Sequence, residues 1–279
     1  MDETSIPVFS IFACIREERI TGAKDLCYAV ENTASAGAFF HAVSLPFRRH
    51  IYEDRPAIRH ARRAPRPARS RGPRTYENHF RSSPFEIAPG IPACVGGVSK
   101  VNAAMAAEIL CLRFGMDMIL NAGVAGCATD LPTGSLVVAS EFIQHDVDTT
   151  AVGDPIGLVS TVNRVAFPTW EPARCTALLQ SLGHSAVTGR VATGDWFAVK
   201  GDRARWIADT FHPTLVEMEG GAIAQVCLRN GVKFAAVKSV SDHLFSDNQT
   251  EEYFDFGYAL KELGKVVLPF ALALQKEEA

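Results

Sequence analysis

Three acidic side chains lie close together in the sequence near the carboxyl end of the chain. They are Glu217, Glu219 and Asp242, in the stretch LVEMEGGAIAQVCLRNGVKFAAVKSVSDHL that covers residues 215–244. Carboxyl groups brought together in one site can divide the duties of acid, base and charge stabilisation when their surroundings give them different pKa values. The three acids are therefore a candidate catalytic cluster, if the fold brings them together.

The residues around these acids predict a helix followed by a buried strand. Past Gly220 and Gly221 the apolar side chains recur at one-turn spacing up to Cys227, and Asn230-Gly231 is a usual helix stop. The nearly continuous apolar run from 232 to 237 is typical of a parallel strand buried on both faces. In a βαβ unit this order brings Glu219 and Asp242 to the same rim, where open α/β sheets bind ligands. The alternative is that each acid only favours or caps a helix N-terminus.

The composition favours one globular domain. The chain has 279 residues, of which 47% are hydrophobic, so it can bury a substantial core. Its seven cysteines show no CxxC spacing, and no His or Cys cluster has metal-ligand spacing, so we expect reduced thiols and neither metal nor cofactor. The acidic start has no basic leader, and no apolar run approaches the roughly 20 residues that span a bilayer. The sequence predicts a cytoplasmic protein without a membrane anchor.

An arginine-rich segment interrupts this domain at about 45–82. Eleven arginines lie between Arg48 and Arg81, with proline among them and few apolar residues, so the segment cannot fold alone. We interpret it as a disordered insertion or as an aberrant stretch of coding sequence. Nucleic acid binding is the less favoured reading, because aromatic side chains do not alternate with the arginines.

Further elements are expected in the rest of the chain. Residues 116–120 predict a short strand that opens onto the small residues of NAGVAG, which would let a ligand approach the backbone. A helix is expected over 100–114, with its apolar stripe formed by Val101, Met105, Ile109 and Leu112. His145 is interpreted as a structural hydrogen-bonding residue. The remaining expectations are strands at 7–15, 91–97, 134–139 and 189–193, a turn at 194–197, and helices at 24–32 and 253–275.

Together, these residues resemble the nucleoside phosphorylase/hydrolase superfamily and, within it, the 5′-methylthioadenosine/S-adenosylhomocysteine nucleosidases. The motifs that carry the resemblance are NAGVAG (121–126), GSLVVASEFIQHDVD (134–148), TGDWF (193–197), VEMEGGAIAQVC (216–227) and VSD (240–242). The resemblance implies a three-layer α/β/α sandwich around a mixed, mostly parallel sheet. It also implies a homodimer, hydrolysis of the N-ribosidic bond of an adenosine derivative, and release of adenine.

The resemblance assigns a duty to each acid. Asp242, oriented by Ser241, would give a proton to adenine N7, which requires a raised pKa. Glu219 would hold the ribose 2′-hydroxyl and stabilise the developing positive charge. Glu18 would activate the water, with Glu17 as the less favoured choice, and Glu217 would be mainly structural.

A smaller group of residues would form the rest of the pocket. Phe197 would stack on the purine, the backbone at Phe197 and Ala198 would read its edge, and Met218 would lie against the sugar. Val98 and Ile15 would pack around the sugar as well. Three positions depart from the family pattern: Val124 stands where many members have serine, Lys238 where arginine is frequent, and Val152 where an aromatic residue is frequent.

Two alternatives remain open at this point. A phosphate-dependent purine nucleoside phosphorylase would need basic or hydroxyl groups around phosphate, and residues 121–127 contain no Arg, Lys, Ser or Thr. A non-catalytic nucleoside-binding protein is the other alternative, because the amino-terminal third departs strongly from the family.

Overall fold

The computed structural model describes residues 10–15, 85–245 and 255–278, with side chains from residue 85 onward. These residues belong to one compact unit. No helix in the described part of the chain is long and apolar enough to cross a membrane. Several predictions lie outside the described residues: the insertion at 45–82, the helix at 24–32, the start of the first strand, and the placement of Glu17 and Glu18.

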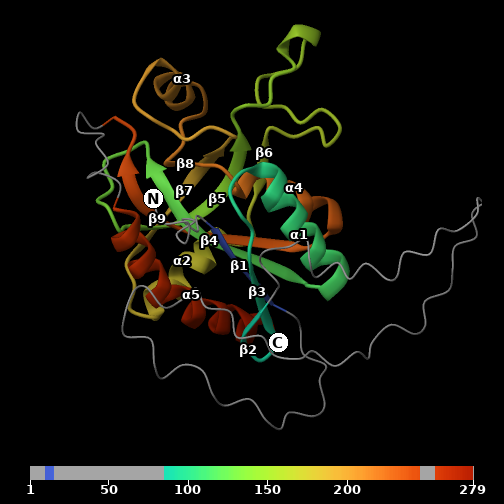
Figure 1. The fold of residues 1–279 in the computed structure, drawn as a ribbon, viewed down its shortest axis with the longest axis vertical. Coiled ribbons are helices and arrows are strands. Elements are labelled where there is room, and N and C mark those ends of the chain that lie inside the picture. Colours follow the sequence, from blue (N-terminus) through green and yellow to red (C-terminus); the bar gives the residue numbers. More distant parts are fainter. Residues whose placement is uncertain (1–9, 16–84, 246–254, 279) are drawn as a thin grey trace, which may run out of the picture. The chain divides into compact units, whose positions relative to one another are not determined.

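A nine-stranded mixed sheet forms the centre of the fold (Figure 1). Five of its strands close a ring, because β4 pairs with β8, β8 with β7, β7 with β5, β5 with β9, and β9 again with β4. Strands β1, β3 and β2 continue the sheet from β4, and β6 adds to β5. The strands are β1 (Ser10–Ile15), β2 (Phe85–Ala88), β3 (Ile91–Val95), β4 (Met118–Cys127), β5 (Leu136–Gln144), β6 (Ala166–Pro168), β7 (Ala186–Thr193), β8 (Leu215–Glu217) and β9 (Lys233–His243).

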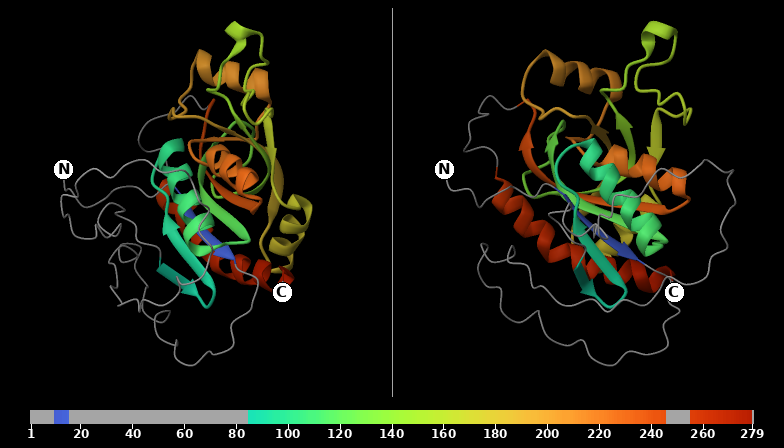
Figure 2. Two further views of the ribbon diagram at one scale, coloured as in Figure 1. Left: turned by 90° about the vertical axis from the view of Figure 1, so that its right-hand side faces the viewer. Right: turned by 45° about the vertical axis from the view of Figure 1, so that its right-hand side comes forward.

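Helices cover the sheet on two sides. Helices α1 (Lys100–Phe114) and α4 (Gly220–Asn230) pack against each other on one side, and α2 (Pro172–Ser181) and α5 (Phe256–Glu278) lie on the other (Figure 2). Helix α3 (Asp202–Phe211) packs near the carboxyl ends of β5, β7 and β8, and a single 3₁₀ turn covers Thr150–Val152. The α/β class and the mixed sheet are confirmed. The closure of the sheet into a ring is not foreseen by the sequence, because hydrophobic patterns do not encode which strand pairs with which.

The main core lies between the sheet and α2 with α5. Leu120, Val138 and Val237 from three ring strands meet Leu179 of α2 and Phe270 of α5, and all five side chains are buried. The apolar face of α5 is thus buried, as expected for the predicted carboxyl-terminal helix, whereas α2 is not among the predicted helices. This layer fixes the strands whose far ends carry the candidate site.

The expected apolar stripe of α1 is wrong, although the helix has the predicted bounds. Its buried face consists of Ala103, Ala106, Ala107, Leu110 and Cys111. Val101 and Leu112 are 74% and 65% exposed, and Met105 is 46% exposed. The alanines let α1 approach α4 closely, so the larger apolar side chains point away from the core.

The predicted glycine loop after residue 120 is also wrong. Strand β4 continues through NAGVAG to Cys127, and every residue of the strand is buried. Because β4 has β9 on one side and β1 followed by β8 on the other, its small residues are pairing positions in the middle of a sheet.

Candidate active site

The candidate site is built around Gly126, near the carboxyl end of β4. Gly126 pairs with Val216 of β8 on one side and with Asp242 of β9 on the other. A methyl group at this position would lie 2.7 Å from Leu244 Cδ1 and 3.0 Å from Asp242 Oδ2, so only glycine fits without displacement. This register brings the Glu217–Glu219 segment, which follows Val216, to the same end of β4 as Asp242.

The path of the chain between these acids differs from the one expected. Strand β8 is antiparallel to β4 whereas β9 is parallel to it, so β8, α4 and β9 do not form the parallel βαβ unit that the sequence predicts. Strand β8 pairs with β4 only through Leu215 and Val216, opposite Cys127 and Gly126 at the carboxyl end of β4. Asp242 pairs with the same Gly126 from the other side, so the two segments that carry the acids reach this end of β4 by a path other than the predicted one.

Asp242 has surroundings that favour its protonated form. Its side chain is buried, and Ser241 Oγ donates a 2.6 Å hydrogen bond to Asp242 Oδ1. Burial raises the pKa of Asp242, and the Ser241 hydroxyl and His243 oppose this only in part. A carboxyl group of this kind is suited to give up a proton during a reaction.

Glu219 lies at the start of α4 and is buried as well. Its Oε1 accepts a 2.9 Å hydrogen bond from the backbone N–H of Ser99. Burial, followed by the nearby charge of Glu217, raises the pKa of Glu219 to about 7, while Lys238 and the N–H groups of Ser99 and Met218 act to lower it. Glu219 can therefore change its charge near neutral pH.

Glu217 is held by polar groups from several neighbouring elements. Its Oε2 lies 3.0 Å from Lys238 Nζ, and both side chains are almost completely shielded from solvent. Glu217 also accepts hydrogen bonds from Thr193 Oγ1 and from the backbone N–H groups of Glu219 and Gly220. These bonds tie β7, β8, β9 and the start of α4 together, which fits a structural duty.

The other predicted pocket residues differ in their exposure to solvent. The ring of Phe197 is 42% exposed and lies 6.5 Å from the ring of Phe256. Ala198, Met218 and Val98 are half-buried. Val124 is buried in β4, and Ile15 ends β1 opposite Met118.

His145 does not act as the hydrogen-bonding residue predicted for it. Within the described residues neither of its ring nitrogens has a partner, and the ring packs beside Gly194 and edge-on to Trp196. Burial lowers the pKa of His145 to about 4, so the ring is neutral at pH 7.

Comparison with known proteins decides the family. The phosphorylase superfamily matches residues 85–273. A 5′-methylthioadenosine/S-adenosylhomocysteine nucleosidase of Shewanella halifaxensis is 35% identical over 189 residues, which cover 65% of this chain and 79% of the relative. The chain belongs to this nucleosidase family. The predicted family is thereby confirmed.

Two solved structures of nucleosidases are similar to the chain. One, from Colwellia psychrerythraea, was determined in complex with adenine; it has 33% identity and a TM-score of 0.60, covering 71% of this chain and 88% of the other. Another, from Neisseria meningitidis, was determined with methylthio-immucillin-A; it has 27% identity and a TM-score of 0.62, covering 71% and 87%.

The sequence reasoning missed four connected polar residues of this nucleosidase chain, one of which, Ser99, donates to Glu219. Ser99 and Lys100 begin α1, Asp146 follows β5, and Asp195 follows β7; hydrogen bonds connect all four. Asp195 is noted in the sequence only as part of a turn. Its position directly after a strand and a glycine was the available signal, because polar residues there lie at the end of the sheet that holds the acids.

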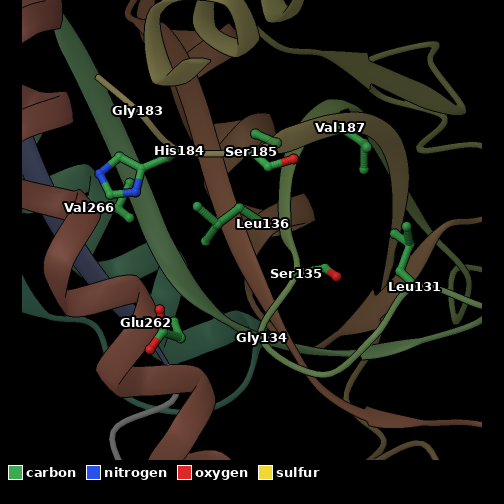
Figure 3. A pocket seen from close by; sticks show the side chains of 11 residues that line it. Leu131, Gly134, Ser135, Leu136, Gly183, His184, Ser185, Val187, Glu262 and Val266 are labelled. Atoms are coloured by element: carbon green, nitrogen blue, oxygen red, sulfur yellow. The ribbon is translucent and has the colours of Figure 1, made fainter. Parts of the chain in front are cut away.

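A separate cavity of about 420 Å³ lies away from the three acids. It is formed near the start of β5, the turn between α2 and β7, and α5, and Figure 3 shows His184, Ser135 and Glu262 among its side chains. None of the predicted site residues lines it. No group of three or more possible metal ligands occurs in the described part of the chain.

Proposed function

We propose that this chain hydrolyses the N-ribosidic bond of 5′-methylthioadenosine, S-adenosylhomocysteine or a related adenosine derivative, releasing adenine and the 5′-substituted ribose. The observation that supports the proposal is the pairing at Gly126, which has the buried Asp242 on one side and, on the other, Val216, three residues before Glu219. Both carboxyl groups have raised pKa values. Relatives named as nucleosidases support the same reaction.

Each acid takes one step of the reaction. Asp242, oriented by Ser241, gives its proton to adenine N7 as the bond between N9 and the anomeric carbon breaks. Ionised Glu219 holds the ribose 2′-hydroxyl and stabilises the positive charge that develops on the sugar. Water attacks the anomeric carbon and loses its proton to Glu18, with Glu17 as the less favoured base; both lie outside the described residues.

The pocket residues would position the nucleoside. Phe197, whose ring is partly exposed, would stack on the purine, and the backbone at Phe197 and Ala198 would read its edge. Met218, Val98 and Ile15 would contact the sugar. Val124 would border the water with a methyl group rather than a hydroxyl, and Glu217 would hold the acids in place through Lys238.

Phosphate independence is the test of this proposal. We expect adenine to form from 5′-methylthioadenosine at the same rate with and without inorganic phosphate, because β4 offers no Arg, Lys, Ser or Thr between residues 121 and 127. Adenine release is followed by chromatography, together with the ribose product. Strict dependence on phosphate, with ribose 1-phosphate as product, would make the chain a phosphorylase. Binding of the nucleoside without any adenine release would make it a binding protein.

A second copy of the chain is proposed to cover the outer face of α1. Val101, Met105 and Leu112 form an exposed apolar stripe on this helix. Burying such a stripe against the same stripe of a second copy would remove apolar surface from water, which favours association.

Charge placed on this stripe is expected to separate the two copies. Sedimentation should give twice the mass of one chain for the unmodified protein, and Leu112→Glu should shift it towards the mass of one chain. Val187→Glu, at an exposed position on β7, is the matched control and should leave the mass unchanged. A single-chain mass for the unmodified protein would contradict the dimer.

The cytoplasm is the proposed compartment. Support comes from Cys94, Cys127 and Cys175, which are buried and form no disulfide. Reduced thiols are usual in proteins of reducing compartments.

A further inference from the structure

Ser99 adopts a backbone conformation that is unusual for a residue with a side chain. Its φ is 85°, in the left-handed region that favours glycine, and it directly precedes the first turn of α1. The conformation is costly and must be held by contacts. Its consequence lies at the active site, because the N–H of Ser99 donates to Glu219 Oε1 at 2.9 Å.

One carboxylate holds Ser99 in this conformation. Asp195 Oδ1 accepts a 2.5 Å hydrogen bond from Ser99 Oγ and a 2.8 Å bond from the backbone N–H of Lys100. The hydroxyl and the following N–H are therefore tied to the same oxygen atom. These two bonds fix the side chain of Ser99 and the peptide that follows it, and in this arrangement the N–H of Ser99 is directed at Glu219.

Asp195 is itself fixed by two further residues. Its backbone N–H donates to Asp146 Oδ2 at 2.9 Å, and Asp146 Oδ1 forms an ion pair with Lys100 Nζ at 2.7 Å. Lys100 also reaches Gln144 Oε1 at 3.3 Å. A closed loop of contacts thus joins the end of β5, the turn after β7 and the start of α1.

We propose that Asp195 is a positioning residue for the reaction: through Ser99, it directs a backbone N–H onto Glu219 Oε1 and so fixes the carboxylate that holds the sugar. The inference rests on the proposed function of Glu219. Asp195 acts on the reacting groups only through Ser99 and Glu219. Asp146 and Lys100 keep Asp195 in place.

A purely structural duty of Asp195 would have a different signature. A carboxylate at a helix N-terminus stabilises the helix whether or not the helix takes part in catalysis. A loss of stability in an Asp195 variant therefore cannot separate a positioning duty from a structural one. Adenine as a product inhibitor can, because it occupies the base site and makes no contact with Glu219. A positioning defect should weaken turnover of the nucleoside and leave the inhibition constant of adenine unchanged.

Asp195→Asn is the first variant to test, in the full chain. We expect kcat for 5′-methylthioadenosine to fall by about tenfold to 10²-fold, the range that a small misplacement of a reacting group produces. The inhibition constant of adenine should stay the same. Asp148→Asn makes the same chemical change two residues from Asp146 at an exposed turn, where Asp148 binds Thr150, and its kcat should equal that of the unmodified enzyme.

A pair of substitutions at Ser99 tests the backbone conformation itself. Ser99→Ala removes the hydroxyl bond and keeps the strain, whereas Ser99→Gly removes both. In the alanine variant the N–H of residue 99 should therefore no longer point at Glu219, and kcat should fall strongly. In the glycine variant kcat should be closer to that of the unmodified enzyme. This comparison also applies if Asp195→Asn fails to fold.

The pH profile gives an independent readout for the Ser99 pair. Burial, followed by the charge of Glu217, raises the pKa of Glu219 to about 7, whereas Lys238 and the N–H groups of Ser99 and Met218 lower it. Glu219 must be ionised to act, so activity is lost as pH falls through this pKa. In Ser99→Ala the acid limb of kcat/KM should move to higher pH, and in Ser99→Gly it should stay close to that of the unmodified enzyme.

The outcomes separate this inference from the proposed function. An unmodified chain that releases no adenine would overturn the function and the inference together. An active chain whose Asp195→Asn variant keeps its kcat, or whose Ser99→Ala and Ser99→Gly variants have equal kcat and equal acid limbs, would overturn the inference alone. Equal weakening of nucleoside turnover and adenine inhibition in Asp195→Asn would assign Asp195 a structural duty only.

Discussion

Replacing Asp242 with asparagine is expected to lower the rate of adenine release by about 10²-fold to 10⁴-fold, the usual contribution of a general acid. Asparagine keeps the size of the side chain and accepts the Ser241 hydrogen bond, but it has no acidic proton for adenine N7. Burial raises the pKa of Asp242, so the native carboxyl is prepared to carry that proton. Adenine release is measured under single-turnover conditions, which separate the chemical step from product release.

A lower rate in Asp242→Asn shows a defect in the chemical step only if the variant still binds the nucleoside. We expect Asp242→Asn to bind 5′-methylthioadenosine, as measured by calorimetry, because the ribose and 5′ contacts remain. Asp130→Asn, at an exposed position after β4, is the control for a lost charge and should keep full activity. An Asp242→Asn variant that releases adenine at the normal rate would show that the proton comes from another group.

The sequence predicts the site better where the signal is local. Helix α4 begins at Gly220 and ends at Asn230 with Gly231 in the left-handed conformation, as the glycine and asparagine signals predict. Strand β9 follows as expected and extends through Asp242 to His243. The ends of these elements depend on residues that are close in sequence, so the residue types alone predict them.

The sequence does not predict which strands pair when they are far apart in the chain. Nothing in NAGVAG distinguishes a ligand loop from a strand of small residues, and only the pairing of Gly126 with Val216 and Asp242 decides for the strand. The contact of Ser99 with Glu219 spans 120 positions and depends on a backbone conformation that serine rarely adopts. Such a contact has no periodic signature.

The outward stripe of α1 illustrates a further limit. The periodic spacing of Val101, Met105 and Leu112 correctly predicts that they share a face of the helix. It does not say whether that face meets the chain's own core or another surface. The buried face of α1 consists mainly of alanines, because close packing of α1 on α4 requires small side chains. Alanine is only weakly hydrophobic, so a pattern of large apolar residues does not reveal this face.

Replacing Lys238 with methionine is expected to lower the free energy of unfolding by about 3–5 kcal/mol, since it leaves the charge of Glu217 buried without its partner. Lys238 is fully buried, and its Nζ lies 3.0 Å from Glu217 Oε2. The measurement is denaturant unfolding of the variant and the unmodified chain. Lys265→Met, which removes an exposed ion pair with Glu262, is the matched control and should cost no more than about 1 kcal/mol.

Removing both charges distinguishes a buried unpaired charge from a simple packing defect. Glu217→Gln combined with Lys238→Met should recover much of the stability lost in Lys238→Met, because no charge then remains without a partner. Lys238→Arg should keep most of the stability, since the charge persists. Should the double variant be less stable than Lys238→Met, the hydrogen bonds of Glu217 to Thr193 and to the start of α4 would be the larger contribution. Either result bears on catalysis, because Glu217 and Lys238 also set the pKa of Glu219 in opposite directions.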